Sequence, residues 1–260
     1  MKSKENKIKL FDLYFDTVTL QQAVRILITA AEHGTKGLVV TPNVDHIVQL
    51  HKNQDLKDIY TTADFVYVDG MPLVWFSRLL PRKYHLPERV NGTNLMIQIC
   101  AVAAKTGLSV AFLGGSEGAA EEAGSRLESR YPGLRVAGHF CPPYGFEDDL
   151  EVNQKIIDLT HTWKPDFLFV GIGNPKQEKW IHSNWNELSF KIAMGVGSAI
   201  DLVAGQITRA PIWMQESGLE WLWRLIQEPR RLWRRYLVQD LSFIPIAWRE
   251  YWRIILTSRQ

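Results

Sequence analysis

Short apolar runs alternate with longer amphipathic segments over the first 208 residues of the chain. The apolar runs have the length of β-strands and lie at 37–41, 64–69, 109–113, 134–140, 167–171 and 192–195. Apolar residues also recur at helical spacing at 44–58, 94–105 and 118–131. Because strands that alternate with helices form βαβ units, the pattern predicts an α/β fold: a Rossmann-like three-layer sandwich with a mostly parallel central sheet.

The pattern changes near residue 208. Segments from Pro211 onward are aromatic, basic and compatible with helices, and Pro229 and Pro245 punctuate them. Residues 209–260 contain nine Arg, no Lys, five acidic residues and six of the ten Trp. We therefore expect an α/β core at 1–208 and a helical, Arg- and Trp-rich appendage at 209–260. A basic, Trp-rich helical segment favours contact with phosphates, an anionic membrane surface, or both.

Composition excludes several classes of protein. With 46% hydrophobic residues, a chain of 260 residues can bury one large core or two modest ones, and 22% charged residues argue against disorder. No apolar run approaches the length of a transmembrane helix, and the polar N-terminus without a signal-peptide core indicates the cytoplasm. Cys100 and Cys141 have no metal-binding spacing, so we expect reduced thiols, no metal site and no cofactor.

Polar and glycine residues follow the ends of the predicted strands. They are Thr41 and Asn43, Asp69, 114–117, 174–178 and 197–201. In open α/β sheets, ligands bind outside the carboxyl ends of the strands. This edge of the sheet is the expected place of a nucleotide-type ligand.

Asp69 and Asn43 each allow two interpretations. A carboxylate at a strand end, before Gly70, can act as a general base towards a substrate hydroxyl, or it can form an Asx-turn or a helix N-cap. Asn43, in Thr41-Pro42-Asn43, can bind a substrate oxygen or cap the helix that begins at Val44.

Two glycine-containing loops are candidate binding loops. Gly114 and Gly115 stand in a strand-to-helix turn whose amides suit an anion, although a tight turn without ligand is an equal alternative. The loop at 171–180 is more informative, because packing alone does not need so many consecutive polar groups. Within it, Lys176 can neutralise a phosphate, Gln177 can both donate to and accept from a base or sugar, and Glu178 is a candidate helix cap.

Aromatic and arginine side chains complete the candidate set. Tyr144, in a Pro/Gly loop, can stack on a nucleobase or cover the edge of the sheet. Arg89 can clamp a phosphate or carboxylate, or can be an ordinary surface residue. Arginines also recur in the C-terminal region, at Arg224, Arg230, Arg231, Arg234 and Arg235. Arg in place of Lys favours shaped phosphate contacts.

In their order, these segments resemble the WecG/TagA/CpsF glycosyltransferases of bacterial cell-surface polysaccharide synthesis. The resemblance runs from about residue 8 to about residue 240. Its motifs are Thr41-Pro42-Asn43, 63–72 with Asp69-Gly70-Met71-Pro72, Glu88-Arg89-Val90-Asn91-Gly92, Phe112-Leu113-Gly114-Gly115, 171–180, and 195–201 with Arg209-Ala210-Pro211.

The resemblance implies transfer of a sugar from a UDP-sugar to a polyprenyl-diphosphate-linked sugar, with inversion and without a metal. By similarity, Asp69 is the general base, with Thr41 and Asn43 beside it. The residues implied to bind substrate are Arg89, Asn91, Gly114, Gly115, Tyr144, Gly173, Asn174, Lys176, Gln177 and Asp201. From the C-terminal region, Arg224, Arg231 and Arg234 are implied to stabilise the leaving UDP.

The implied partners are the UDP-sugar, the lipid-linked acceptor and an anionic membrane, with a homo-oligomer possible and no nucleic acid. The implied location is the cytoplasmic face of the membrane. The identity of the donated sugar is left open, because small contacts in the pocket decide it. The candidates are N-acetylmannosamine, its uronic acid and glucose.

Three other classes of protein compete with this interpretation. A nucleotide-sugar epimerase or dehydrogenase requires GxGxxG after the first strand and a Tyr-x-x-x-Lys pair, and the sequence has neither. A nucleic-acid-binding protein would be expected to have a basic body as well. A non-catalytic membrane scaffold leaves the polar clusters at the strand ends without a purpose.

Overall fold

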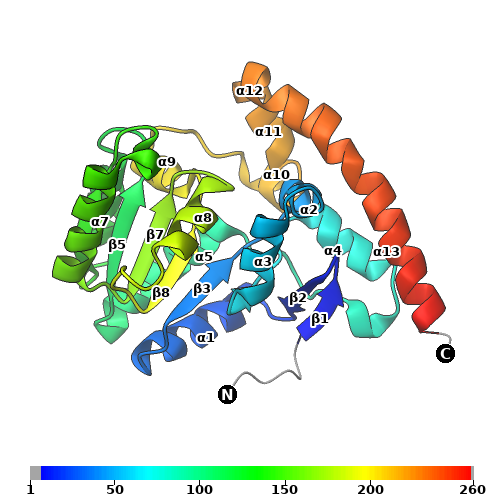
Figure 1. The fold of residues 1–260 in the computed structure, drawn as a ribbon, viewed down its shortest axis with the longest axis horizontal. Coiled ribbons are helices and arrows are strands. Elements are labelled where there is room, and N and C mark those ends of the chain that lie inside the picture. The colour runs from blue at the N-terminus through cyan, green and yellow to red at the C-terminus, as the bar shows by residue number, and fades with distance from the viewer. Residues whose placement is uncertain (1–6, 259–260) are drawn as a thin grey trace.

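A computed structural model describes residues 7–258, apart from the side chains of Glu216, Arg231, Arg235 and Leu237. A six-stranded sheet lies at its centre (Figure 1), in the order β4-β3-β8-β7-β5-β6. The strands are β3 (Gly37–Val40), β4 (Phe65–Val66), β5 (Ser109–Gly114), β6 (Arg135–Phe140), β7 (Phe167–Gly171) and β8 (Ile192–Gly195). All of its strand pairs are parallel, so the predicted α/β class is confirmed. A strand lies in each of the six predicted places, but the one expected at 64–69 is only the two residues of β4.

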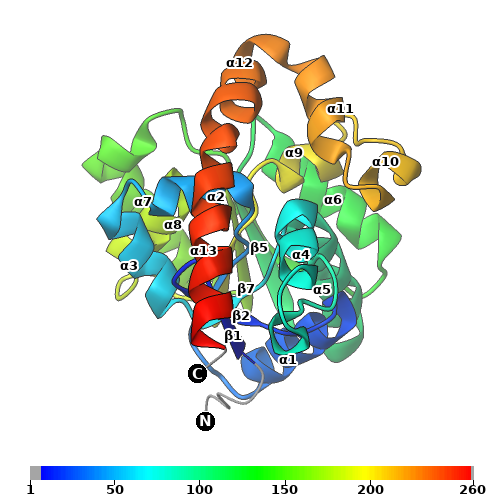
Figure 2. The same cartoon turned by 90° about the vertical axis from the view of Figure 1, so that its right-hand side faces the viewer.

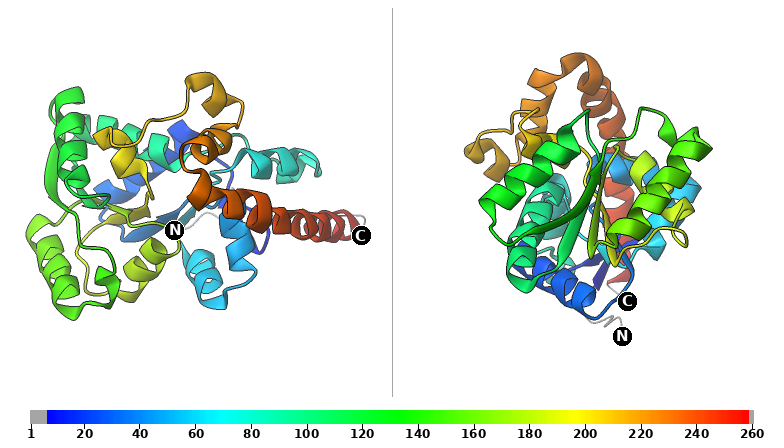
Figure 3. Two further views of the ribbon diagram at one scale, coloured as in Figure 1. Left: turned by 90° about the horizontal axis from the view of Figure 1, so that it is seen from above. Right: turned by 90° about the vertical axis from the view of Figure 1, so that its left-hand side faces the viewer.

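Helices cover both faces of the sheet (Figure 3). One face carries α1 (Leu20–Glu32), α5 (Gly92–Thr106), α6 (Ala119–Arg130) and α9 (Ala199–Ala204); the other carries α2 (Val44–Leu50), α3 (Gln54–Thr62), α7 (Leu150–Trp163) and α8 (Lys176–Ser183). Side chains of the central strands alternate between these layers. In β7, for example, Phe167 and Phe169 pack on the first layer and Leu168 and Val170 on the second. The predicted three-layer arrangement is confirmed.

Two parts of the core differ from the prediction. The helix expected at 44–58 is two helices, because Asn53 accepts the amide of Leu56 at 3.0 Å and begins α3 as its N-cap. An antiparallel hairpin of β1 (Lys7–Leu10) and β2 (Leu13–Asp16) was not predicted. Its two turn residues, Phe11 and Asp12, have φ of 52° and 64°, values that bulky residues rarely adopt. On the same side of the core lie α4 (Met71–Arg78) and the short helix η2 (Arg82–Tyr84), and η3 (Phe146–Asp148) precedes α7.

Residues 211–258, which we call the C-terminal segment, are helical as predicted. The segment comprises α10 (Ile212–Glu216), α11 (Glu220–Gln227), α12 (Pro229–Arg234), the π-helix η4 (Arg235–Gln239), the 3₁₀-helix η5 (Asp240–Ser242) and α13 (Phe243–Thr257). Pro229 begins α12, whereas Pro245 lies in the first turn of α13, where its missing N–H is tolerated. The first three helices lie beyond the carboxyl ends of the strands, and α13 returns alongside α2 to the hairpin (Figure 2).

The far end of the C-terminal segment is fastened to the hairpin. The Phe11 backbone N–H donates to Glu250 Oε1 at 2.8 Å, and Arg253 donates to the same carboxylate at 2.6 Å. The rings of Phe11 and Phe243 are 5.4 Å apart, and Ile254 is part of the buried core. None of the helices in residues 7–258 has the length and apolar character needed to cross a membrane.

Candidate active site at the carboxyl edge of the sheet

Asp69 lies just beyond β4. Its backbone N–H donates to the Pro42 carbonyl at 3.0 Å, which continues the pairing of β3 and β4 past their ends. Gly70, and not Asp69, is the N-cap of α4. The Asp69 carboxylate instead accepts Asn91 Nδ2 on Oδ1 at 3.0 Å and the Gly92 backbone N–H on Oδ2 at 3.1 Å. The carboxylate is therefore fixed against the N-terminus of α5, where the helix dipole favours a negative charge.

The environment of Asp69 makes its carboxylate unusually basic. Its side chain is 18% exposed, and burial raises the pKa of Asp69 to about 6, against the opposing effects of the Arg89 charge and the Gly92 N–H. A general base is most effective when its pKa lies near the working pH. Asp69 is thus ionised at neutral pH and still able to take a proton.

Thr41 and Asn43 lie beside Asp69 in different ways. A Cβ placed on Gly92 would lie 3.2 Å from Thr41 Oγ1 and 3.7 Å from Asp69 Oδ2, so Gly92 is the point where both side chains meet α5. Asn43 is the N-cap of α2, in a capping box with His46. The capping alternative that the sequence allowed for Asn43 is what the structure shows.

Three arginines surround one carboxylate next to Asp69. Arg89 Nη2 donates to Glu220 Oε2 at 3.0 Å, while Arg209 Nε and Arg224 Nη2 lie 3.9 Å and 4.0 Å from Glu220 Oε1. The Arg89 and Glu220 side chains are only 13% and 10% exposed, so Arg89 is not a surface residue. We call Arg89, Arg209 and Arg224 the arginine cluster. It joins the core to α11, because Glu220 and Arg224 belong to the C-terminal segment.

Gln177 and Asn174 belong to a second polar group, between β7 and β8. Gln177 Oε1 accepts the Gly197 N–H at 3.0 Å, and its Nε2 donates to Glu178 at 2.9 Å. Asn174 Nδ2 donates to Glu178 Oε2 at 3.2 Å, and burial raises the pKa of Glu178. These side chains hold the two loops together at the edge of the sheet.

Gly114, Gly115 and Asp201 form a third group. The Gly115 N–H donates to the Gly171 carbonyl at 2.8 Å, and the Ser116 N–H donates to Asp201 Oδ1 at 2.8 Å. Gly114 has φ of +102°, and a Cβ there would lie 2.6 Å from the Gly171 oxygen, so only glycine fits. The Gly115 and Ser116 amides, which the sequence offered to an anion, are thus engaged within the protein.

The remaining predicted residues lie on the surface or outside the described side chains. Tyr144 is 97% exposed, with Lys176 Nζ 4.6 Å from its ring centroid, and Lys176 also pairs with Glu147. A Cβ on Gly173 would meet open space. Arg234 is exposed on α12, whereas the side chain of Arg231 lies outside the described residues.

A comparison with protein families shows which family the chain belongs to. The model of the glycosyl transferase WecG/TagA/CpsF family matches residues 8–255. The chain belongs to this family. The resemblance seen in the sequence motifs is confirmed, and the chain is a glycosyltransferase.

Individual relatives agree with the family. The N-acetylglucosaminyldiphosphoundecaprenol N-acetyl-beta-D-mannosaminyltransferase of Staphylococcus aureus strain MRSA252 is 31% identical over 247 residues, which cover 94% of this chain and 92% of the relative. The enzyme of the same name from strain MW2 is 30% identical over the same shares of the two chains.

Glu220 and Arg209 were not predicted as site residues of this glycosyltransferase. The sequence carries one signal for Glu220, which stands four residues before Arg224 and so shares a helix face with it. Arg209 stands in a family motif, and its side chain is tied to α5 by a 2.7 Å hydrogen bond to Asn94 Oδ1. Its buried Nε makes no hydrogen bond within the described residues.

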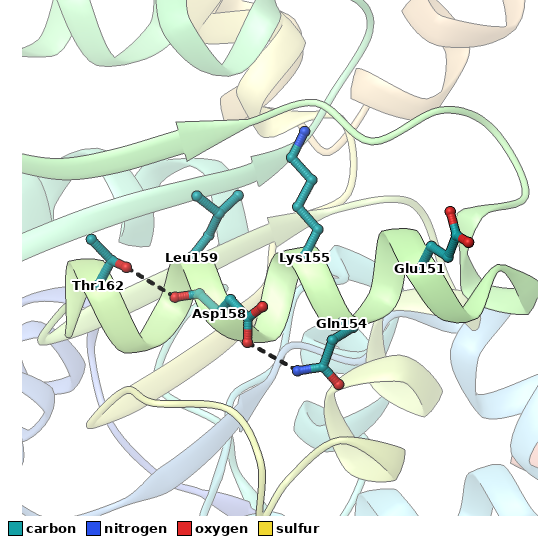
Figure 4. A pocket seen from close by; sticks show the side chains of 6 residues that line it. All are labelled: Glu151, Gln154, Lys155, Asp158, Leu159 and Thr162. Carbon is teal, nitrogen blue, oxygen red and sulfur yellow. Dashed lines mark hydrogen bonds between the residues drawn. The ribbon is translucent and has the colours of Figure 1, made fainter.

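Two surface cavities are lined by helices of the outer layers, and the second of them reaches the arginine cluster. A cavity of 470 Å³ is lined by one helix only, α7, with side chains such as Glu151, Lys155 and Asp158 (Figure 4). Gln154 and Asp158 there satisfy each other with a 2.9 Å hydrogen bond. A second cavity of 370 Å³ lies between α5, α6 and α9, and Arg209 forms part of its wall. The α7 cavity includes none of the predicted site residues, so it does not represent the active site.

Proposed function

We propose that the chain transfers an N-acetylmannosamine-type sugar from a UDP-sugar to the sugar of a polyprenyl-diphosphate-linked acceptor, with inversion and without a metal ion. The single observation that carries the proposal is the Asp69 carboxylate, fixed by Asn91 and Gly92 beside the arginine cluster. The names of the Staphylococcus aureus relatives supply the sugar and the acceptor class. The family resemblance supplies UDP.

Asp69 takes the proton in this mechanism. As the acceptor hydroxyl oxygen forms a bond to the anomeric carbon, its proton passes to Asp69, and the bond between that carbon and the UDP oxygen breaks. UDP leaves with the electron pair. A pKa of about 6 suits Asp69 to this transfer, because the carboxylate is ionised at neutral pH and more basic than an exposed Asp.

Inversion follows from a single displacement. The relatives are named for a β-linked mannosaminyl product, and attack on an α-linked donor from the opposite face gives that anomer in one step. Such a step needs one base on the acceptor side and charge stabilisation on the leaving-group side, and it needs no covalent intermediate. Asp69 and the arginine cluster supply these two functions from neighbouring positions.

The arginine cluster supports the proposal that UDP leaves without the help of a metal ion. Three guanidinium groups face the carboxylates of Glu220 and Asp69, so the described side chains there keep one excess positive charge. The β-phosphate of UDP gains negative charge as the glycosidic bond breaks, and preorganised cations stabilise that charge. Arginine forks match phosphate oxygens in geometry as well as in charge.

Sugar transfer with EDTA present tests the proposal directly. Purified protein is incubated with a short-chain polyprenyl-diphosphate N-acetylglucosamine and UDP-N-acetylmannosamine, UDP-glucose or the UDP-linked mannosaminuronic acid, and products are identified by mass spectrometry. We expect a disaccharide from UDP-N-acetylmannosamine at the same rate with and without EDTA. A rate that falls to background in EDTA and returns with a divalent ion would disprove metal independence. Absence of transfer, combined with thermal stabilisation by NAD but not by UDP, would overturn the whole assignment.

We also propose that α13 meets the surface of an anionic membrane. Ile244, Trp248, Trp252 and Leu256 recur every fourth residue along one side of this helix and are exposed, whereas Glu250 and Ile254 face the core. Arg249, seven residues before Leu256 and therefore near the same side, is also exposed. A basic residue beside an exposed apolar side is typical of helices that lie in a membrane interface. A lipid-linked acceptor gives such a surface a purpose, because the reaction must then take place next to a bilayer.

The double variant Trp248→Gln, Leu256→Gln should bind vesicles of anionic phospholipid at least about tenfold more weakly than the wild-type protein, because two large apolar side chains no longer enter the interface. Sedimentation with vesicles measures this, and Leu150→Gln, an exposed leucine on α7, is the matched control. Point variants are preferable to deleting residues 209–260, since deletion would expose the core around Phe11 that α13 covers. Equal sedimentation of the wild type, the double variant and the control would show that α13 does not bind the membrane surface.

A further inference from the structure

Arg89 stands between two carboxylates and is bound to only one of them. Its Nη2 donates to Glu220 Oε2 at 3.0 Å, whereas its Nε lies 3.8 Å from Asp69 Oδ1, which is too long for a hydrogen bond. Asp69 and Arg89 belong to the core, and Glu220 is in the first turn of α11. The direction of the Arg89 guanidinium is therefore set by a residue of the C-terminal segment.

We propose that Glu220 is a positioning residue, which holds the Arg89 guanidinium off the Asp69 carboxylate and so keeps the base free to take a proton. The proposal rests on the proposed function, because it concerns the base assigned there. Glu220 touches neither reacting atom; it acts through Arg89.

The charges around Asp69 explain why the position of Arg89 matters. Asp69 faces the Arg89 charge, the Glu220 charge and the neutral donors Asn91 Nδ2 and Gly92 N–H. The Arg209 charge, 3.9 Å from Glu220, also interacts with Asp69. Burial and Glu220 raise the pKa of Asp69, whereas Arg89 and the Gly92 N–H lower it. An arginine in full contact with an aspartate stabilises the ionised form and makes it a poorer base.

Docking of the C-terminal segment is then coupled to the strength of the base. With α11 in place, Glu220 takes the Arg89 hydrogen bond, and the same carboxylate lies within 4.0 Å of Arg224 on the leaving-group side. With α11 displaced, Asp69 remains as the carboxylate close to Arg89, at 3.8 Å, and the two neutralise each other. A single residue of the segment thus brings both halves of the site into their working arrangement.

The Glu220→Gln variant tests the proposal, because glutamine keeps the shape of the side chain and loses its charge. The pKa of Asp69 is measured by NMR titration in protein with ¹³C-labelled aspartate carboxyls, with Asp69→Asn assigning the signal. We expect the pKa to fall by roughly one pH unit, which is the low end of the effect of an adjacent guanidinium. Glu122→Gln is the matched control, because Glu122 forms an i,i+4 pair with Arg126 on α6, as Glu220 does with Arg224.

A double-mutant cycle separates two effects on the pKa of Asp69: the position of Arg89, and the direct influence of the Glu220 charge. In an Arg89→Gln background, Glu220→Gln should lower the pKa of Asp69 by much less than in the wild-type background. An equal fall in both backgrounds would show that Arg89 carries none of the effect, and an unchanged or raised pKa in Glu220→Gln would likewise overturn the proposal. If Glu220→Gln lowers the melting temperature, Glu220→Asp provides a second test. Its shorter side chain keeps the charge, so the pKa of Asp69 should be closer to the wild-type value than in Glu220→Gln.

The pH dependence of kcat/KM separates this inference from the proposed function. If Asp69 is the base, the acid limb should move with the measured pKa, so that at pH 5 the Glu220→Gln variant keeps about half of its plateau and the wild type about a tenth. If the Asp69 signal moves and the acid limb does not, the role of Glu220 stands and the assignment of Asp69 as base fails.

Discussion

Asp69→Asn should lower kcat by about 10³-fold and leave the dissociation constant of UDP within about threefold of the wild-type value. The amide has nearly the shape of the carboxylate but cannot take a proton from the acceptor hydroxyl. UDP binding depends on the arginines, whose partner Glu220 is retained. Single-turnover transfer and calorimetric UDP binding measure the two quantities separately.

The Asp69→Asn variant has a structural cost that the experiment must separate from catalysis. Asn91 Nδ2 and the Gly92 N–H both donate to the carboxylate, and one amide oxygen replaces only one of these acceptors. We expect a loss of about 1 kcal/mol in the free energy of unfolding, too small to unfold the protein. Asp58→Asn, on the exposed side of α3, is the control with the same change of charge. Normal turnover by Asp69→Asn would exclude Asp69 as the base.

The wild-type enzyme should lose kcat/KM as the pH falls through about 6, because protonation of Asp69 removes the base. Burial raises the pKa of Asp69, so activity is lost at a higher pH than it would be with an exposed aspartate as the base. In Asp69→Asn the residual rate should show no such limb.

Arg224→Ala should lower kcat by about 10²-fold, with a smaller rise in the KM for the UDP-sugar. Charge on the β-phosphate grows as the glycosidic bond breaks, so a guanidinium that meets it stabilises the transition state more than the bound donor. The kcat of Arg224→Lys should lie between those of the wild type and Arg224→Ala, because lysine keeps the charge and loses the planar fork. Steady-state kinetics with a water-soluble acceptor analogue make the comparison independent of membrane binding.

Arg249→Ala is the control for Arg224→Ala, since it removes the same charge from an exposed position of the same segment. It should keep kcat for the soluble acceptor. A rise in KM without loss of kcat in Arg224→Ala would mean that this arginine binds the donor uniformly and does not stabilise the leaving group.

Much of the sheet could be predicted because its strands are buried on both faces and read as continuous apolar runs. The break between α2 and α3 was missed because apolar residues continue on both sides of it, at Ile47, Leu50 and Leu56. A turn at 51–53, which ends in the cap at Asn53, separates the two helices. The hairpin turn at Phe11 and Asp12 was missed for a related reason: it has no glycine, and its positive φ values are maintained by packing against α13.

The sequence could predict the site residues that follow the ends of strands. It could not predict those that the C-terminal segment brings to the core. Thr41 and Asp69 follow adjacent parallel strands, so their proximity follows from the βαβ pattern. Arg89 was expected to clamp a phosphate or a carboxylate; in the structure it donates to the carboxylate of Glu220 and lies 3.8 Å from that of Asp69. Glu220 reaches that place only through the packing of α11, which no local pattern encodes.

The hydrogen bond between Phe11 and Glu250 joins residues 239 positions apart. On the ribosome, therefore, the hairpin emerges long before its partner in α13 is made, and Glu220 and Arg224 also follow every strand of the sheet. Domains fold as their residues become available during synthesis, so the sheet can be complete while the reaction edge still lacks these two charged residues. A nascent chain at that stage would have a folded sheet whose reaction edge lacks both residues, and the proposed site would be complete only after α11 packs against the core.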